Sequence, residues 1–245
     1  MTTVHAAPTR YTQQEFEKSV LALSPSIAVF DCDGTLWSGD AGYGFMVWSI
    51  ETGLVSRNAA DWIDSRYRQY LAGEISEAAM CGEMVQIYAG LQEEEIRRAA
   101  AEYFRLHIES HIFSELRSLV SRLQKDGVEI WAVSSTNNWV IEEGVRHFDI
   151  PDSRVLSARV RVADDGHITS DLIAVPTDEA KATALQEVGI PRPDAVFGNS
   201  VHDAAMLAIA RRAFPVNPTP ALAEIAAQRN WTVFYPDSVL TDSKL

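Results

Sequence analysis

Two aspartates stand on either side of Cys32 in the stretch "AVFDCDGTLWSGD", residues 28–40. They directly follow an apolar run that is typical of a buried strand, so both charges lie at the end of that strand. Because a buried charge without a partner destabilises a fold, such a placement indicates a functional site. Side chains two residues apart along an extended chain point to the same side, and Asp31 and Asp33 are therefore expected to face one site together.

Further polar clusters occur later in the chain, in the order "SSTNN" (134–138), Lys181 and "GNSVHD" (198–203). The first and last of these follow predicted strands, and Lys181 stands near the start of a predicted helix. In open α/β sheets, ligands bind beyond the carboxyl ends of the strands. The clusters therefore predict one polar site at that edge of a sheet, shared with the two aspartates.

These four clusters, in this order and spacing, resemble the motifs of the haloacid dehalogenase-like hydrolase superfamily. The first motif, D-x-D-G-T-L, is the most specific, and the resemblance covers nearly the whole chain from about residue 26. The sequence is most similar to the branch typified by phosphoserine phosphatase, which has a helical cap inserted after the first motif. The resemblance implies a Rossmann-like α/β core and a hydrolase that acts on a small phosphorylated metabolite.

In this family pattern, Asp31 is the nucleophile and Asp33 the general acid and base. A carboxylate with an unperturbed pKa near ~4 is ionised at neutral pH, so Asp31 can attack phosphorus and form an aspartyl-phosphate. Asp33 would protonate the departing alkoxide and then accept a proton from the attacking water. Crowding of carboxylates raises the pKa of one of them, which suits a proton donor. Family members that displace halide from carbon lack this second aspartate, so Asp33 favours phosphoryl transfer.

The resemblance assigns Ser134, Ser135 and Lys181 to phosphate binding. Ser134 directly ends the apolar strand and therefore fits the motif better than Ser135. A serine at this position is equally suited to capping the helix that follows. Lys181 would neutralise the phosphate and hold Asp31, with Lys125 as the less favoured substitute.

The last cluster departs from the family pattern G-D-S/G-x-x-D, because Asn199 replaces the first acid. The resemblance implies Mg²⁺, a hard cation that takes oxygen ligands with only one or two carboxylates among them. The expected ligands are Asp31, the Asp33 carbonyl and Asn199, with Asp203 bound directly or through water. One negative charge fewer predicts weaker metal affinity than the usual pattern would give.

Asp40 is the predicted substrate-binding residue, because phosphoserine phosphatases have an acid that contacts the substrate ammonium at about this position. The same aspartate in "SGDAG" also suits a turn. The aromatic residues around it could form a cage for a quaternary ammonium, as in phosphocholine, although the helical spacing within the set favours the core. Arg66 and Arg68 could contact a substrate carboxylate, but their spacing does not place them on one helix face. The aromatic set is Trp37, Tyr43, Phe45 and Trp48.

Short apolar runs alternate with helical patterns along the rest of the chain, as in a parallel sheet covered on both faces. Strands are predicted at 27–30, 128–134, 194–200, 212–216 and 231–235. Helices are predicted at 114–125, 137–148, 177–188, 202–210 and 219–228, with a further short helix in "QQEFEKSVLAL" near the N-terminus. Residues 154–173 form two alternating runs around "DDG" and predict a β-hairpin added to the sheet.

Residues from about 42 to 111 carry helical patterns and no convincing strand. We therefore predict a helical cap at 41–111, inserted into a Rossmann-like core formed by 1–40 and 112–245. A lid placed directly after the carboxylate strand could close over the site and exclude water. The alternative is that these helices pack on the sheet within a single domain.

Composition excludes some classes of partner. The 245 residues are 47% hydrophobic, as in globular proteins, and their formal charge of -13 argues against binding to nucleic acids or to anionic membranes. Two cysteines, the lack of a secretory signal pattern and the lack of an apolar run of ~20 residues predict a cytoplasmic protein. The oligomeric state does not follow from these patterns.

Together the patterns predict a Mg²⁺-dependent phosphomonoester hydrolase that works through an aspartyl-phosphate. Its expected substrate is a small phosphorylated metabolite that carries an amine or ammonium group. A phosphotransferase or mutase would use the same intermediate with an alcohol in place of water as the acceptor. Asn199 motivates a third interpretation, a catalytically weak protein that binds a phosphorylated ligand.

Overall fold

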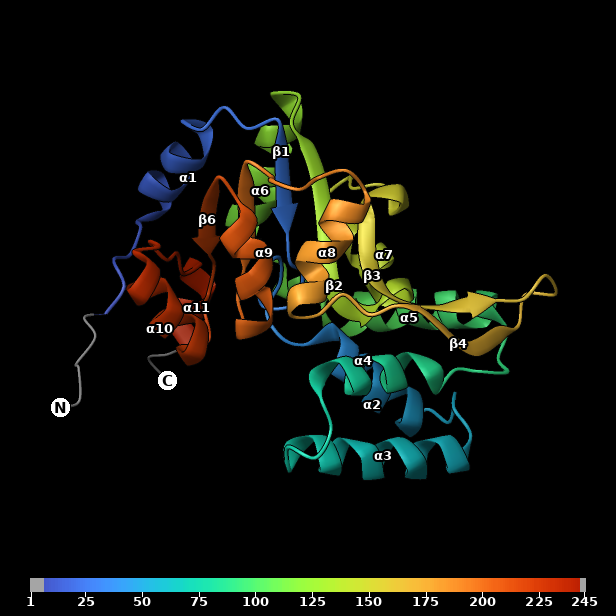
Figure 1. Ribbon diagram of the computed structural model, residues 1–245. Coiled ribbons are helices and arrows are strands. Elements are labelled where there is room, and N and C mark those ends of the chain that lie inside the picture. The colour runs from blue at the N-terminus through green and yellow to red at the C-terminus, as the bar shows by residue number, and fades with distance from the viewer. Residues whose placement is uncertain (1–6, 243–245) are drawn as a thin grey trace.

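The computed structural model describes residues 7–242 as an α/β structure built on a six-stranded sheet (Figure 1). The strand order is β4-β3-β2-β1-β5-β6, and all neighbours are parallel except β3 and β4, which are antiparallel. The predicted fold class and the hairpin at 154–173 are therefore confirmed. The strands are β1 (Ile27–Phe30), β2 (Glu129–Asn137), β3 (Val155–Val162), β4 (Ile168–Ala174), β5 (Ala195–Gly198) and β6 (Arg212–Pro215).

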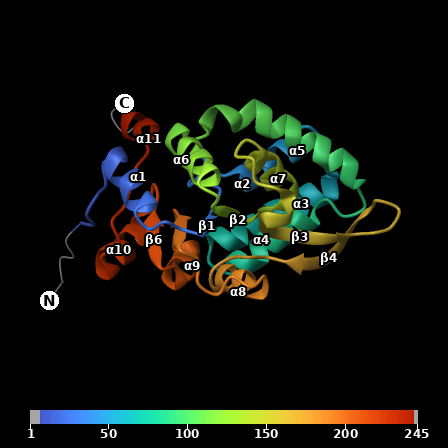
Figure 2. The same cartoon turned by 90° about the horizontal axis from the view of Figure 1, so that it is seen from above.

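Helices cover both faces of this sheet. Figure 2 shows α6 and α7 on one face and α8 and α9 on the other. Alternate residues of β1 pack against the helices on opposite faces of the sheet. Ala28 and Phe30 belong to the hydrophobic cluster of α6 and α7, and Val29 belongs to that of α8 and α9. The core helices are α1 (Gln13–Leu21), α6 (Ser114–Lys125), α7 (Asn138–Arg146), α8 (Glu179–Glu187), α9 (Ala204–Ile209), α10 (Pro220–Arg229) and α11 (Asp237–Asp242), with 3-10 turns at Glu109–His111, Asp152–Arg154 and Val201–Asp203.

The run 231–235 does not form a strand, contrary to the prediction from its apolar pattern. It makes isolated bridges to neighbouring chain, one of them between Phe234 and Val216. Phe234 also stacks on Phe16 of α1, with ring centroids 4.1 Å apart and planes at 4°. Val233 and Phe234 are therefore buried without a continuous ladder, and burial alone produces the same apolar pattern as a strand. The same contact shows that the N-terminal helix packs on the core.

The segment predicted as a cap is helical, with α2 (Ala41–Glu51), α3 (Arg57–Leu71), α4 (Glu77–Gln86) and α5 (Glu93–His107). Figure 1 shows α2, α3 and α4 beyond the carboxyl ends of the strands, whereas α5 lies along the core. Buried Glu142 of α7 accepts hydrogen bonds from Arg97 of α5 at 2.8 Å and from Arg159 of β3 at 2.7 Å. These charged contacts join α5 to the core, and the division at 41–111 stays a prediction.

The longest helices, α3 and α5, have 15 residues each. A helix needs about 20 apolar residues to cross a bilayer. No helix within residues 7–242 reaches the length and apolarity of a membrane span. The cytoplasmic location stays a prediction.

Candidate active site

A cavity of about 300 Å³ lies between the carboxyl ends of the strands and the helices α2, α3 and α4. All four predicted clusters contribute to this side of the molecule, because parallel strands end at the same edge of the sheet. Asp203 is the predicted residue that does not line the cavity, and it is fully buried behind it. The predicted residues that do line it are Asp31, Asp33, Asp40, Ser134, Ser135, Lys181 and Asn199.

Asp31 follows β1 directly, and both of its carboxylate oxygens accept a hydrogen bond. Lys181 Nζ donates to Oδ1 at 2.7 Å, and Thr35 Oγ1 donates to Oδ2 at 2.8 Å. Cys32 lies in the hydrophobic core on the opposite side, so the expected alternation of side chains is present. Burial raises the pKa of Asp31 to about 6, with the charge of Asp203 adding to the effect and Lys181 opposing it. Asp31 is thus mostly ionised at neutral pH, as a nucleophile must be.

Asp33 has a different set of donors. Trp37 Nε1 and the Ala41 N–H donate to Oδ1 at 2.7 and 2.8 Å, and Thr136 Oγ1 donates to Oδ2 at 2.8 Å. Burial and, second to it, the charge of Asp40 raise the pKa of Asp33, the three donors oppose both effects, and the resulting pKa is about 7. A carboxyl group with this pKa is partly protonated at neutral pH and can donate a proton. Different surroundings thus give the two aspartates different roles.

Lys181 of α8 is buried between two carboxylates. Its Nζ donates to Asp31 at 2.7 Å and to Asp203 at 2.6 Å. Burial lowers the pKa of Lys181, but the charges of Asp203 and Asp31 outweigh this and raise the pKa above its ordinary value. The second oxygen of Asp203 accepts from the backbone N–H groups of Asn199 and Ser200 at 2.8 and 2.9 Å. Both oxygens of Asp203 thus have protein donors, and a direct bond to a metal would displace one of them.

Asn199, Ser200 and His202 of the last cluster line the cavity, and Asn199 is the one predicted as a metal ligand. Gly34 has a φ of +75°, and a Cβ there would lie 1.8 Å from Asn199 Nδ2, so glycine allows the amide to pack against the loop after Asp33. The oxygens that would hold Mg²⁺ are the Asp31 carboxylate, the Asp33 carbonyl and the Asn199 amide. This mixed set fits the preference of Mg²⁺ for few carboxylates. Within residues 7–242 no three His, Cys, Asp or Glu side chains form a metal cluster.

Ser134 and Ser135 both line the cavity, but their hydroxyls have different partners. Ser135 donates to the Pro176 carbonyl at 3.1 Å, whereas Ser134 accepts from the Thr136 N–H at 3.2 Å and keeps its own hydrogen to donate. Ser134 is therefore better placed to bind a phosphate oxygen. The helix that follows is capped by another residue, since the side chain of Asn137 accepts from the first turn of α7. Lys125 is exposed at the end of α6, outside the cavity.

Asp40 lines the cavity and also caps α2. Its Oδ1 accepts from the Tyr43 N–H at 2.8 Å, so the carboxylate is held at the cavity wall. Burial raises the pKa of Asp40, and the charge of Glu77 raises it further. Asp40 can therefore serve both the turn and substrate binding, because the cap uses only Oδ1 and leaves Oδ2 for a substrate.

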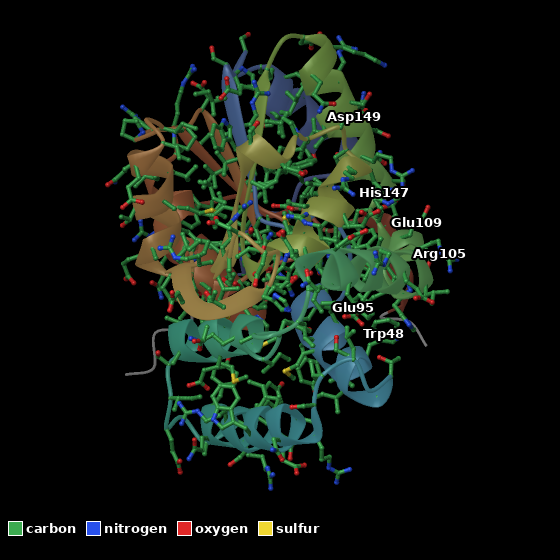
Figure 3. The ribbon with its side chains drawn as sticks, turned by 90° about the vertical axis from the view of Figure 1, so that its right-hand side faces the viewer. Trp48, Glu95, Arg105, Glu109, His147 and Asp149 are labelled. Carbon is green, nitrogen blue, oxygen red and sulfur yellow. The ribbon has the colours of Figure 1, made fainter. Side chains whose placement is uncertain are left out.

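The aromatic residues around Asp40 do not form a cage. Tyr43 lines the cavity, but the other three members of the set are not among its lining residues. Trp48, for example, has its ring 6.0 Å from that of Tyr103 of α5, and Figure 3 shows it on α2 close to α5, the helix that carries Glu95. The preference for a core position is correct for Phe45, which is fully buried, and Trp48 packs partly buried against the same core.

The far wall of the cavity comes from α3 and α4, which no sequence motif marks. Tyr67 of α3 stacks on Tyr43 with ring centroids 4.7 Å apart. Helical periodicity predicts these helices but does not say which of their residues meet the strand ends. His202, from the turn after β5, also lines the cavity. The lining residues that sequence reasoning missed include Tyr67, Tyr70, Glu77, Thr136 and His202.

The two arginines considered for a substrate carboxylate have other partners. Arg66 makes a bidentate ion pair with Glu83 at 2.7 and 2.6 Å, and Arg68 pairs with Asp64 at 2.6 Å. Neither lines the cavity. Among the described lining residues the only lysine or arginine is Lys181, whose charge is already shared by two carboxylates. The cavity therefore offers no free cation to a substrate carboxylate.

Comparison with known proteins places this geometry in a family. The haloacid dehalogenase-like hydrolases match residues 28–208, a span that contains all four motifs. The chain belongs to this family. The hydrolase is 26% identical over 218 residues to the histidinol-phosphatase of Neisseria meningitidis serogroup C (strain 8013). The match covers 85% of this chain and 97% of the relative.

Solved structures with the same fold include a protein of unknown function from Bordetella pertussis Tohama I. It has a TM-score of 0.74 and 24% identity, and the match covers 85% of this hydrolase and 97% of that chain. A substrate-bound phosphoserine phosphatase has a TM-score of 0.58 and 15% identity, covering 87% and 93% of the two chains. These identities show a shared fold. The predicted family and its phosphoserine phosphatase-like fold are thus confirmed, and the relatives support a phosphatase.

Proposed function

We propose that this hydrolase cleaves phosphomonoesters of small alcohols that carry an amine, through an aspartyl-phosphate on Asp31. The observation that supports this most strongly is the contrast between two neighbouring carboxyl groups in one cavity. Asp31 is held by Lys181 and Thr35 and its pKa is raised only to about 6, whereas Asp33 has a different set of donors and its pKa is raised to about 7. An ionised nucleophile beside a partly protonated acid is the pair that phosphoryl transfer from an ester requires.

In the first step, a bond forms between an Asp31 oxygen and phosphorus while the bond from phosphorus to the leaving oxygen breaks. Asp33 gives its proton to that leaving oxygen. Its three donors then stabilise the carboxylate, which accepts a proton from the water that hydrolyses the aspartyl-phosphate. Ser134 and Lys181 would contact the phosphate oxygens. Mg²⁺, when bound by Asp31, the Asp33 carbonyl and Asn199, would neutralise phosphate charge.

The cavity lining supports a cationic leaving group without a carboxylate. Asp40 and three tyrosine rings face the space beyond the phosphate position, and a substrate carboxylate would meet no free lysine or arginine there. Histidinol phosphate, the compound implied by the name of the Neisseria relative, carries an amine and an imidazole and has no carboxylate. Phosphoserine would place its carboxylate beside Asp40, and we expect it to be the poorer substrate.

The test is phosphate release with Mg²⁺ from histidinol phosphate, phosphoethanolamine, phosphocholine and phosphoserine. Asp31→Asn and metal-free samples serve as controls, and release is expected to need both Asp31 and the metal. An added alcohol that captures the phosphate would indicate a phosphotransferase instead. If the folded protein with saturating Mg²⁺ releases phosphate from none of these esters, the hydrolase proposal fails and the binding role motivated by Asn199 gains support.

A further inference from the structure

Glu77 is the first residue of α4 and lines the cavity on the side of the helices that lie beyond the strand ends. Its Oε1 accepts a hydrogen bond from Cys81 Sγ at 3.4 Å. Its Oε2 is buried, and no group of the described chain donates a hydrogen bond to it. His202 Nε2 lies 3.8 Å from this oxygen, too far for a hydrogen bond. One oxygen of Glu77 is therefore held in place while the other lacks a donor.

A buried carboxylate oxygen without a donor destabilises the protein, so its retention beside a binding cavity indicates a partner from outside the chain. The groups around it determine the chemistry of that partner. Asp40 lies close enough for the charge of Glu77 to act on it, and Asp178 is hydrogen-bonded to His202 at 2.8 Å. Lys181 is paired at the catalytic end of the cavity. This end of the cavity thus favours a positively charged N–H donor.

We propose that Glu77 is a specificity-determining residue that accepts a hydrogen bond from a cationic nitrogen of the leaving alcohol. It would act with Asp40, so that one carboxylate from α4 and one from the start of α2 face the same end of the substrate. The inference rests on the proposed function, because it places a phosphomonoester in this cavity. It adds that α4 distinguishes cationic from neutral esters, since a neutral ester leaves Glu77 Oε2 without a donor.

The test compares Glu77→Gln with the unchanged protein on two esters of similar size, phosphoethanolamine and n-propyl phosphate. A hydrogen bond to a charged group is strong enough for its loss to reduce kcat/KM about tenfold to about a hundredfold. We expect that reduction for phosphoethanolamine and almost no change for n-propyl phosphate. Glu83→Gln is the matched control, because Glu83 lies on the same helix and is paired with Arg66 outside the cavity.

Equal losses on both esters would show that Glu77 only supports α4, and would overturn the inference. An unchanged kcat/KM for phosphoethanolamine would overturn it as well. If the unchanged protein hydrolyses neither ester, the proposed function is what fails, and calorimetric binding of the same two esters then decides the role of Glu77. Preferential binding of phosphoethanolamine that is lost in Glu77→Gln supports the inference, whereas the same binding in both proteins contradicts it.

Discussion

Removal of the Thr136 hydroxyl should raise the pKa of Asp33. Thr136 Oγ1 donates to Asp33 Oδ2 at 2.8 Å, and this bond favours the ionised carboxylate. Thr136→Val keeps the shape of the side chain but removes the donor. Burial and the charge of Asp40, which raise the pKa of Asp33, would then be opposed only by the Trp37 Nε1–H and the Ala41 N–H.

The size of the effect follows from the strength of the lost bond. Hydrogen bonds to charged groups contribute about 1.5–3 kcal/mol, and about 1.4 kcal/mol corresponds to a change of one in pKa. Two donors to Asp33 remain in the variant, and the protonated carboxyl can donate a hydrogen bond to another acceptor. We therefore expect a loss near the lower end of the range, about 1.5 kcal/mol. The pKa should rise from about 7 to about 8. Asp33 must be protonated to act as the acid, so activity should persist to higher pH.

The measurement is kcat/KM for the best ester as a function of pH. Its basic limb reports loss of the Asp33 proton in the free enzyme and should move upward by about one pH unit in Thr136→Val. Thr52→Val is the control, since that hydroxyl donates to a backbone carbonyl at the exposed end of α2. A basic limb that stays in place or moves downward in a folded Thr136→Val protein would refute the assignment of Asp33 as the acid.

Three further substitutions test other parts of the structure. Lys181→Met leaves Asp31 and Asp203 buried without their cation, so the free energy of unfolding in urea should fall by about 3–5 kcal/mol and phosphate release should be lost; an unchanged urea midpoint would contradict this. Asn199→Asp should tighten Mg²⁺ binding in calorimetry by about tenfold, because a ligand gains a charge; equal affinity would place Asn199 outside the ligand set. Phe16→Ala should lower the free energy of unfolding by about 3–5 kcal/mol with kcat/KM retained, since this buried ring does not line the cavity; lost activity in the folded variant would argue against this.

The catalytic end of the cavity was predictable because local rules determine it. Alternation along an extended chain places Asp31 and Asp33 on one side, and parallel strands bring Ser134 and Asn199 to the same edge. A raised pKa for one of the two carboxyl groups was also expected, but from the crowding of Asp31 and Asp33. In the structure, burial is the largest cause of the raised pKa of Asp33 and the charge of Asp40 is the second. Both causes depend on how α2 packs against the sheet.

The α/β class, the order of the motifs and the helical nature of the segment after β1 follow from local patterns in the sequence. The ion pair of Asp203 with Lys181, the burial of Val233 and Phe234 outside any strand, and the place of Glu77 in the cavity lining all depend on the tertiary structure. The two sets of features differ because the interactions behind them differ in range along the chain. The periodicity of apolar residues within a short segment indicates that one face of that segment is buried. It does not indicate which element covers the face, because that element comes from a distant part of the chain.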